Sequence, residues 1–241
     1  MGTIEDINDG MATTAHKWDA VFRALATAWL LSTIVFISGY QKGALGYAGY
    51  SSNGVEHVEA GTTPIALVLA LIGLVFFSVL ARTELRVGNF QIAPLWRRYI
   101  ALLVDFWFFV FTYAALFAMI PLALEARHTG TFQWAFERDG SISSDWVGDA
   151  LILIGLAAMP AYFVLTLANR RQTLGRWMLR IATVNVDGNA VRVPVFVALR
   201  RTYREVRELL SPSALWGMVT GKPVDEGARY HDDDHFIVVR Y

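Results

Sequence analysis

The chain has 241 residues, of which 55% are hydrophobic and 17% are charged. This composition is typical of a membrane protein, because each helix that crosses the hydrocarbon core needs about 20 apolar residues. The 21 basic and 21 acidic residues balance, so no global positive field favours nucleic acid as a partner. The absence of cysteine excludes disulfides, iron–sulfur clusters and thiolate chemistry.

Four apolar segments follow one another along the chain, and we expect each to form a membrane-spanning helix. They lie at about residues 21–40, 63–81, 100–124 and 147–168. The polar, acidic segment 1–17 lacks the basic start and apolar centre of a cleaved signal peptide. The first apolar segment is therefore expected to stay as an anchor. The predicted fold class is an all-α membrane protein with four transmembrane helices.

The distribution of arginines predicts how these helices are oriented. The basic residues gather in the second linker and in the tail after the fourth helix: Arg82, Arg86, Arg97, Arg98, Arg170, Arg171, Arg176 and Arg180. Basic connecting segments stay on the cytoplasmic side of a membrane. Both termini are therefore predicted to be cytoplasmic, and the location to be a bacterial-type cytoplasmic (inner) membrane that the chain crosses several times.

The two linkers on the opposite side differ in composition. Residues 41–62 are rich in glycine, serine and tyrosine, and we expect them to be irregular. Residues 125–146 carry four aromatic side chains of the kind found at membrane interfaces. We interpret this second linker as an anchoring loop, with a short interfacial helix as the alternative.

The tail at 169–241 is too polar to cross the membrane again. Residues 181–186 alternate like a strand, and the Asp-Gly-Asn turn signal after them favours a hairpin that returns through 190–193. A helix is predicted at 195–210 and a final short strand at 236–240. The tail should therefore contain a small β element beside one helix.

The helix of the tail is predicted to be amphipathic and basic. Its arginines fill much of the polar side: Arg200, Arg201, Arg204 and Arg207. A basic amphipathic helix next to a membrane favours anionic headgroups, at about 1 kcal/mol for each basic residue near the surface. We expect these arginines to dock on lipid headgroups or on a partner protein.

One acid, Asp105, lies inside the third apolar segment. Arg98 precedes it by seven residues, close to two helical turns, so both side chains leave nearly the same side of the helix. An ionisable group in a membrane helix marks either a functional site or a pairing partner. Asp105 could bind a proton or cation, but we favour a structural clamp between the third and fourth helices. The predicted clamp partners follow the fourth apolar segment: Arg170, Arg171, Thr173, Gly175 and Arg176.

The sequence offers little support for catalysis or metal binding. Two histidines flank three aspartates at 231–235, a pattern that would suit a divalent ion on a helix. A solvated acidic turn that pairs with the basic helix is the simpler interpretation, so we predict no metal and no cofactor. No nucleophile–base arrangement and no hydrolase or zinc-protease motif occurs, so we do not expect an enzyme.

Three short motifs, taken in order, resemble those of the RDD family of membrane proteins. They are Arg98-x-x-Ala101-x-x-x-Asp105, then Gln172-Thr173-x-Gly175 and Asp187-Gly188, with a terminal acidic segment around Asp232. The family is named after one arginine and two aspartates. The resemblance assigns these positions to Arg98, Asp105 and Asp232, with Asp233 and Asp234 as alternatives for the last.

The resemblance covers residues 94–241 and leaves 1–93, with the first two helices, as an N-terminal extension. It implies membrane transport, with Asp105 as the acid of a small transporter coupled to protons or cations. The scarcity of polar groups inside the membrane and the absence of repeats favour a different role. We predict a non-catalytic accessory, scaffold or assembly subunit that packs against other membrane subunits or a second copy.

Overall fold

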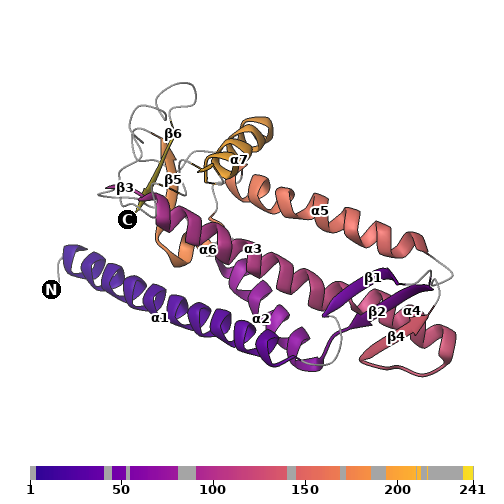
Figure 1. Ribbon diagram of the computed structural model, residues 1–241. Coiled ribbons are helices and arrows are strands. Elements are labelled where there is room, and N and C mark those ends of the chain that lie inside the picture. Colours follow the sequence, from indigo (N-terminus) through magenta and orange to yellow (C-terminus); the bar gives the residue numbers. More distant parts are fainter. Residues whose placement is uncertain are drawn as a thin grey trace.

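The helices and strands of the protein are taken from a computed structural model. It describes residues 4–40, 45–52, 55–80, 91–139, 145–168, 172–185, 194–209, 211–212, 216 and 236–240. Most of the described residues are helical. The long helices form one bundle, with a small sheet at each end (Figure 1).

The bundle contains five helices that correspond to the four predicted apolar segments. They are α1 (Ile4–Gly39), α2 (Pro64–Leu80), α3 (Leu95–Phe117), α4 (Met119–Thr129) and α5 (Asp145–Ala168). Within the described residues, two helical stretches are long and apolar enough to cross a membrane, at 19–39 and 96–129. The apolar parts of α2 and α5 are shorter, at 64–78 and 150–166.

The third apolar segment is interrupted where α3 gives way to α4. The helical path continues through Ala118, and Pro121 follows in the first turn of α4. Proline has no backbone N–H, so Pro121 cannot donate to the carbonyl of Phe117 four residues earlier. This missing hydrogen bond explains why one apolar run of the sequence forms two helices.

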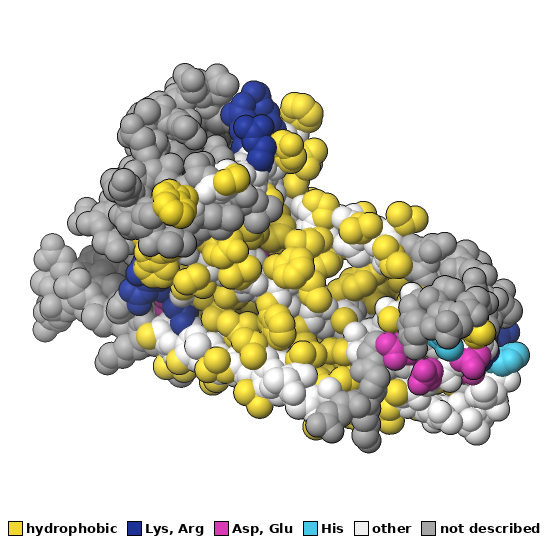
Figure 2. All heavy atoms as spheres, viewed as in Figure 1, with side chains coloured by type: hydrophobic (Ala, Val, Ile, Leu, Met, Phe, Trp, Pro, Cys, Tyr) yellow, Lys and Arg dark blue, Asp and Glu magenta, His cyan; other side chains and the backbone are white. Residues whose placement is uncertain are grey.

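The outer surface of the bundle is apolar. Side chains that are about half exposed or more occur on four of its helices: Leu25, Leu31, Val35, Ile65, Leu71, Val75, Leu103, Leu153 and Leu156. Hydrophobic side chains cover much of the face of the bundle seen in Figure 2. A surface of this kind is stable in lipid, whereas a soluble monomer rarely exposes so large an apolar patch.

One core joins the N-terminal helices to the rest of the chain. Its buried members come from α1, α2, α3 and α6 (Leu174–Met178): Ala26, Trp29, Ala66, Ala70, Phe108, Phe111, Ala115, Leu174 and Trp177. The guanidinium of Arg23 also lies over the ring of Trp177, 5.5 Å from its centre. The first two helices therefore share a hydrophobic core with α3 and α6.

Trp29 holds α1 against α2. Its indole Nε1 donates a hydrogen bond of 2.7 Å to the carbonyl of Leu69. At Gly73, a Cβ would lie only 2.7 Å from the Trp29 ring, so the absence of a side chain there permits the contact. The indole thus fits a space between the two helices and also satisfies its polar atom.

Replacing Trp29 by phenylalanine should lower the free energy of unfolding by about 1 kcal/mol, the usual value of one hydrogen bond between membrane helices. Unfolding of the purified protein by SDS in mixed micelles measures the change. The matched control is Trp96→Phe, because Trp96 is half exposed. Equal losses for the two variants would contradict the role assigned to the Trp29 hydrogen bond.

The linker at 41–62, which was expected to be irregular, forms a sheet together with part of the linker at 125–146. Strands β1 (Gly46–Ser52), β2 (Val55–Gly61) and β4 (Ala135–Asp139) pair antiparallel in the order β1-β2-β4. The prediction of an irregular 41–62 is wrong, and 125–146 contributes the end of α4 and a strand. Glycine-rich β1 lacks the apolar alternation that identifies a strand, and among the described strands it pairs only with β2.

The second sheet contains two strands that the sequence predicts. Strand β5 (Ile181–Asn185) and the terminal strand β6 (Phe236–Arg240) pair antiparallel, and β3 (Gln91–Ile92) pairs with the other edge of β6. The predicted hairpin return at 190–193 lies outside the described residues. The partner of β5 is thus a strand about 50 residues later, which a local turn signal cannot indicate.

The predicted helix of the tail is confirmed as α7 (Val195–Leu209), which packs against α5. Helix α7 lies beside the C-terminal end of α5 (Figure 1). Helix α1 begins, and strand β6 ends, at this same end of the bundle (Figure 1). The described elements of the tail therefore lie at one end of the bundle, opposite the β1-β2-β4 sheet.

Candidate functional site

The candidate site is centred on Asp105, whose side chain is only 1% exposed. Its Oδ1 atom accepts hydrogen bonds from the Gly175 backbone N–H at 2.7 Å and the Tyr162 hydroxyl at 3.0 Å. Its Oδ2 atom accepts a third from the Thr173 hydroxyl at 2.5 Å. A buried carboxylate is tolerated when its oxygens find donors, and here both oxygens do.

Two of these donors also hold the start of α6. The Tyr162 hydroxyl accepts the backbone N–H of Leu174 at 3.0 Å while it donates to Asp105. The Thr173 hydroxyl caps α6 by accepting the N–H of Arg176 at 3.4 Å. The carboxylate therefore joins three segments, namely α3, α5 and the first turn of α6.

Gly175 lets α6 approach α3 more closely than any other residue would. A Cβ at this position would lie 2.1 Å from the carbonyl oxygen of Ala101. It would also lie 2.9 Å from the carbonyl carbon and 3.0 Å from the Cα of the same residue. Ala101 is one helical turn before Asp105, so the small residue and the acid lie on the same side of α3. The spacing Ala-x-x-x-Asp thus places a contact surface beside a hydrogen-bond acceptor.

Gln172 connects this contact to the second sheet. Its Nε2 donates to the carbonyl of Ile181, the first residue of β5, at 3.0 Å. Arg180 between α6 and β5 adopts a φ of 54°, the left-handed conformation that turns the chain. The motif Gln-Thr-x-Gly therefore has a mechanical explanation, since three of its positions bind or contact α3 or the start of β5.

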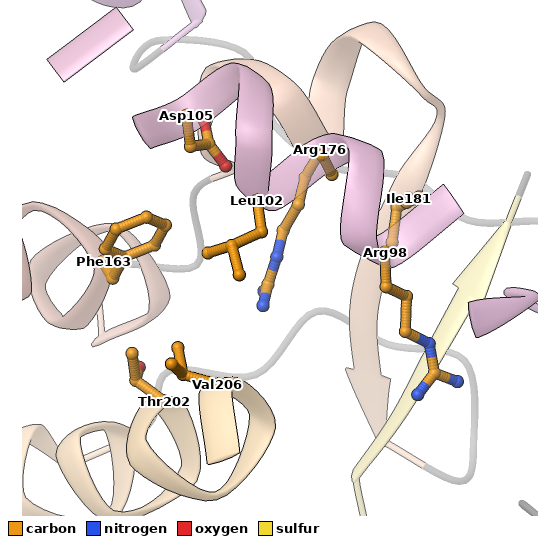
Figure 3. Close-up of a pocket in the computed structure, with 9 residues that line it drawn as sticks. Arg98, Leu102, Asp105, Phe163, Arg176, Ile181, Thr202 and Val206 are labelled. Carbon is orange, nitrogen blue, oxygen red and sulfur yellow. The ribbon is translucent and has the colours of Figure 1, made fainter. Parts of the chain in front are cut away.

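Arg98 is buried, with an exposed fraction of 4%, but its guanidinium points away from Asp105 (Figure 3). Arg176 extends past Leu102 in the direction of α7 (Figure 3). The three hydrogen bonds to Asp105 come from hydroxyl and amide groups. The hydrogen bonds described at the carboxylate thus come from neutral donors, and the charge of Arg176 also acts on Asp105.

A small pocket borders the site (Figure 3). It is lined by Arg98, Ala101, Leu102, Asp105, Phe163, Arg176, Ile181, Thr202 and Val206. The space fits about one water-sized molecule. An organic solute would not fit without movement of the helices, whereas a water or a small ion would.

The structure brings together some of the predicted site residues and leaves others apart. Thr173 and Gly175 contact Asp105 directly, and Arg176 lines the same pocket. Three further predicted positions lie outside the described residues: Arg170, Arg171 and Asp232. Within the described part of the chain, no group of three metal-binding side chains occurs, and the histidines at 231 and 235 fall outside it.

Two residues of the site were not assigned a contact with Asp105 or Gly175 from the sequence. Tyr162 completes the hydrogen bonds at Asp105, and Ala101 supplies the backbone against which Gly175 packs. A tyrosine in an otherwise apolar helix indicates a hydrogen-bonding role for Tyr162, because a buried hydroxyl needs a partner. The position of Ala101, one turn before Asp105, indicates that it lies beside the acid on α3.

The apolar bundle, its exposed hydrophobic surface and the buried acid define a helical membrane protein. The chain belongs to the RDD family, whose family model matches residues 92–212, half of the chain. The match includes Arg98, Asp105 and the segment 172–175, and it ends before Asp232. No curated protein and no solved structure matches the chain.

Proposed function

We propose that this RDD-family protein is a non-catalytic scaffold or assembly subunit of a larger complex in a cytoplasmic membrane. The observation that supports this proposal most directly is that hydrogen-bond donors of the same chain surround the buried carboxylate. Both oxygens of Asp105 accept hydrogen bonds that tie α3 to α5 and α6. A carboxylate used in this way fixes helices in place, and the bundle can then present a constant surface to a partner.

The apolar surface supports the same role. Leu153 and Leu156 on α5 are exposed to 65% and 67%. The apolar part of α5, at 150–166, is shorter than the two stretches that are long enough to cross a membrane. Short apolar helices in membranes are stabilised by packing with neighbours or by oligomerisation. We propose that other membrane subunits or a second copy cover α5, with four helices crossing the membrane and both termini in the cytoplasm.

A second candidate function is ion-coupled transport through Asp105. The observation that favours it is Thr112, whose buried hydroxyl has no hydrogen-bond partner among the described residues. Thr112 follows Asp105 by seven residues, so both lie on nearly the same side of α3. Together with the small pocket, these two side chains could mark steps of a path for a proton or a cation.

The two functions are separated by one pair of measurements on the purified protein. In proteoliposomes with an imposed proton or sodium gradient, we expect no flux above that of empty vesicles. Purification in a mild detergent should recover another membrane protein, or a second copy, in a fixed ratio. Flux in the wild type that disappears in Asp105→Asn, while the variant still purifies as a folded protein by gel filtration, would overturn the scaffold proposal.

A further inference from the structure

We propose that α7 is an interfacial helix that binds the anionic headgroups of the membrane in which the bundle is embedded. This inference is independent of whether the protein is a scaffold or a transporter. It rests on how three kinds of side chain are distributed around α7 and on where α7 lies.

The first side of α7 is covered by the protein itself. Ala198 is completely buried, and Thr202 and Val206 line the pocket beside Asp105. These residues are spaced four apart, so they form one line along the helix. This line anchors α7 on α5 and α3.

The second side of α7 is apolar but exposed. Phe196 is 76% exposed and Tyr203 65%, and both Val195 and Leu199 are at least about half exposed. At about 100° per residue, Leu199, Tyr203 and Phe196 occupy one narrow band next to the buried line. Val206, by contrast, lines the pocket beside Asp105. An aromatic and aliphatic band of this kind needs an apolar environment.

The third side of α7 is basic. Arg200, Arg204 and Arg207 are exposed and follow the apolar band around the helix. Long arginine side chains can keep their charge in the headgroup layer while their stems lie along apolar surface. An apolar band bordered by arginines is the pattern of helices that lie in the membrane interface.

The position of α7 agrees with this pattern. Helix α7 lies at the end of the bundle where α3 begins, and basic side chains adjoin exposed hydrophobic ones there (Figures 1 and 2). At the start of α3, Trp96 is half exposed and the Arg97 guanidinium lies 5.4 Å from its ring centre. Tryptophan and arginine together mark the level of the membrane–water interface. The apolar band of α7 is therefore at a depth where lipid is the available partner.

The charge of α7 identifies the lipid. Arginines recognise phosphate oxygens with paired N–H donors, and anionic headgroups present these at high density. A protein partner would have to match the apolar band and the arginines together, whereas a membrane surface offers acyl chains and phosphates in that order. The occupant we propose is therefore an anionic phospholipid such as phosphatidylglycerol.

The experiment uses the whole 241-residue chain, which contains no cysteine, so one introduced cysteine gives a single labelling site. Leu199→Cys carries an environment-sensitive fluorophore, and the protein is reconstituted in vesicles of phosphatidylcholine with or without phosphatidylglycerol. Nitroxides attached to the lipid headgroup region should quench the label, and iodide in the water should not. Quenching by the lipid should be greater when phosphatidylglycerol is present.

Charge variants of α7 test the role of the arginines. Changing Arg200, Arg204 and Arg207 to glutamine should weaken docking by about fivefold per arginine and reduce lipid quenching to match. The same positions changed to lysine should retain it. The matched control is Arg127→Gln, an exposed arginine in the last turn of α4, which should change nothing.

Several results would overturn the proposal. One is a label that iodide reaches and lipid nitroxides do not. A second is a label shielded from both, which would place protein on this face, either the acidic segment at 232–234 or another chain. A third is quenching that is equal in the two lipid mixtures and unchanged in the glutamine variant. Because the lysine variant controls for folding, a loss confined to glutamine supports the proposal.

Discussion

Replacing Gly175 by alanine should lower the free energy of unfolding by at least about 3 kcal/mol, the upper end of the overpacking range. The added Cβ would lie 2.1 Å from the Ala101 carbonyl oxygen, far inside contact distance. The atoms it meets belong to the backbone of α3, so no side-chain rotation relieves the clash. Either α6 moves away from α3, or the hydrogen bond from the Gly175 N–H to Asp105 is lost. The melting temperature in mild detergent, together with gel filtration, measures the effect.

Two other glycines provide a graded control for this experiment. At Gly155, a Cβ would lie 3.0 Å from the ring of Tyr113, which can shift, so alanine should cost about 1 kcal/mol. At Gly39, the last residue of α1, nothing lies within 4 Å, and alanine should be neutral. A Gly175→Ala protein as stable as Gly39→Ala would show that α6 does not pack on α3 as described.

Replacing Asp105 by alanine should also destabilise the protein by about 3 kcal/mol or more, because buried donors are left without an acceptor at about 1–3 kcal/mol each. The Gly175 N–H cannot turn to another partner, and the hydroxyls of Tyr162 and Thr173 also lose theirs. Asparagine should cost only about 1–2 kcal/mol, since one oxygen remains to accept hydrogen bonds. Unfolding by SDS in mixed micelles gives both values.

A double-mutant cycle can assign this loss to the clamp. Thr173→Val keeps the size of the side chain but removes its hydroxyl, which both caps α6 and donates to Asp105. Combined with Asp105→Asn, it should show a coupling energy of about 1 kcal/mol, as for residues in one hydrogen-bond network. Thr173→Ser retains both hydrogen bonds and is the control. Strictly additive losses would contradict a direct contact.

The helices of the bundle are predictable from the sequence because each coincides with a long apolar run. The predicted run at 63–81 is α2 at Pro64–Leu80, and 147–168 is α5 at Asp145–Ala168. Helix α1 begins at Ile4, well before the apolar part, because polar residues can also continue a helix once it is nucleated. Local apolar pattern thus identifies the helices better than it identifies their ends.

The sheet at the far end could have been predicted in part. The sequence between β1 and β2 contains Asn53-Gly54, and a two-residue Asn-Gly connection is the strongest short signal for a hairpin. The tyrosines of β1 are also good strand formers. The pairing of β2 with β4, by contrast, joins residues such as His57 and Asp139, which are 82 positions apart. Pairing at such a separation depends on the bundle that brings the linkers together.

The candidate site was predictable to the extent that helical spacing and motif order determine it. The spacing of Ala101 and Asp105 places both on one side of α3, and the order of the motifs indicates that residues 172–175 follow the next long helix. The direction of Arg98 was not predictable in this way. Arg98 lies in the first turn of α3, where its guanidinium can extend beyond the helix, and Asp105 is satisfied by nearer donors.

The hydrogen bonds at Asp105 have a consequence for how the protein is made. Thr173 and Gly175, which donate two of them, lie 68 and 70 residues later in the chain. At ordinary rates of translation, on the order of 10 s separates the synthesis of the acid from that of these donors. Helix α3 therefore leaves the ribosome with an acid that has none of its final partners. The helix becomes fully compatible with lipid only once residues 162–175 have emerged and folded back onto it, so completion of the clamp is a late step of biogenesis.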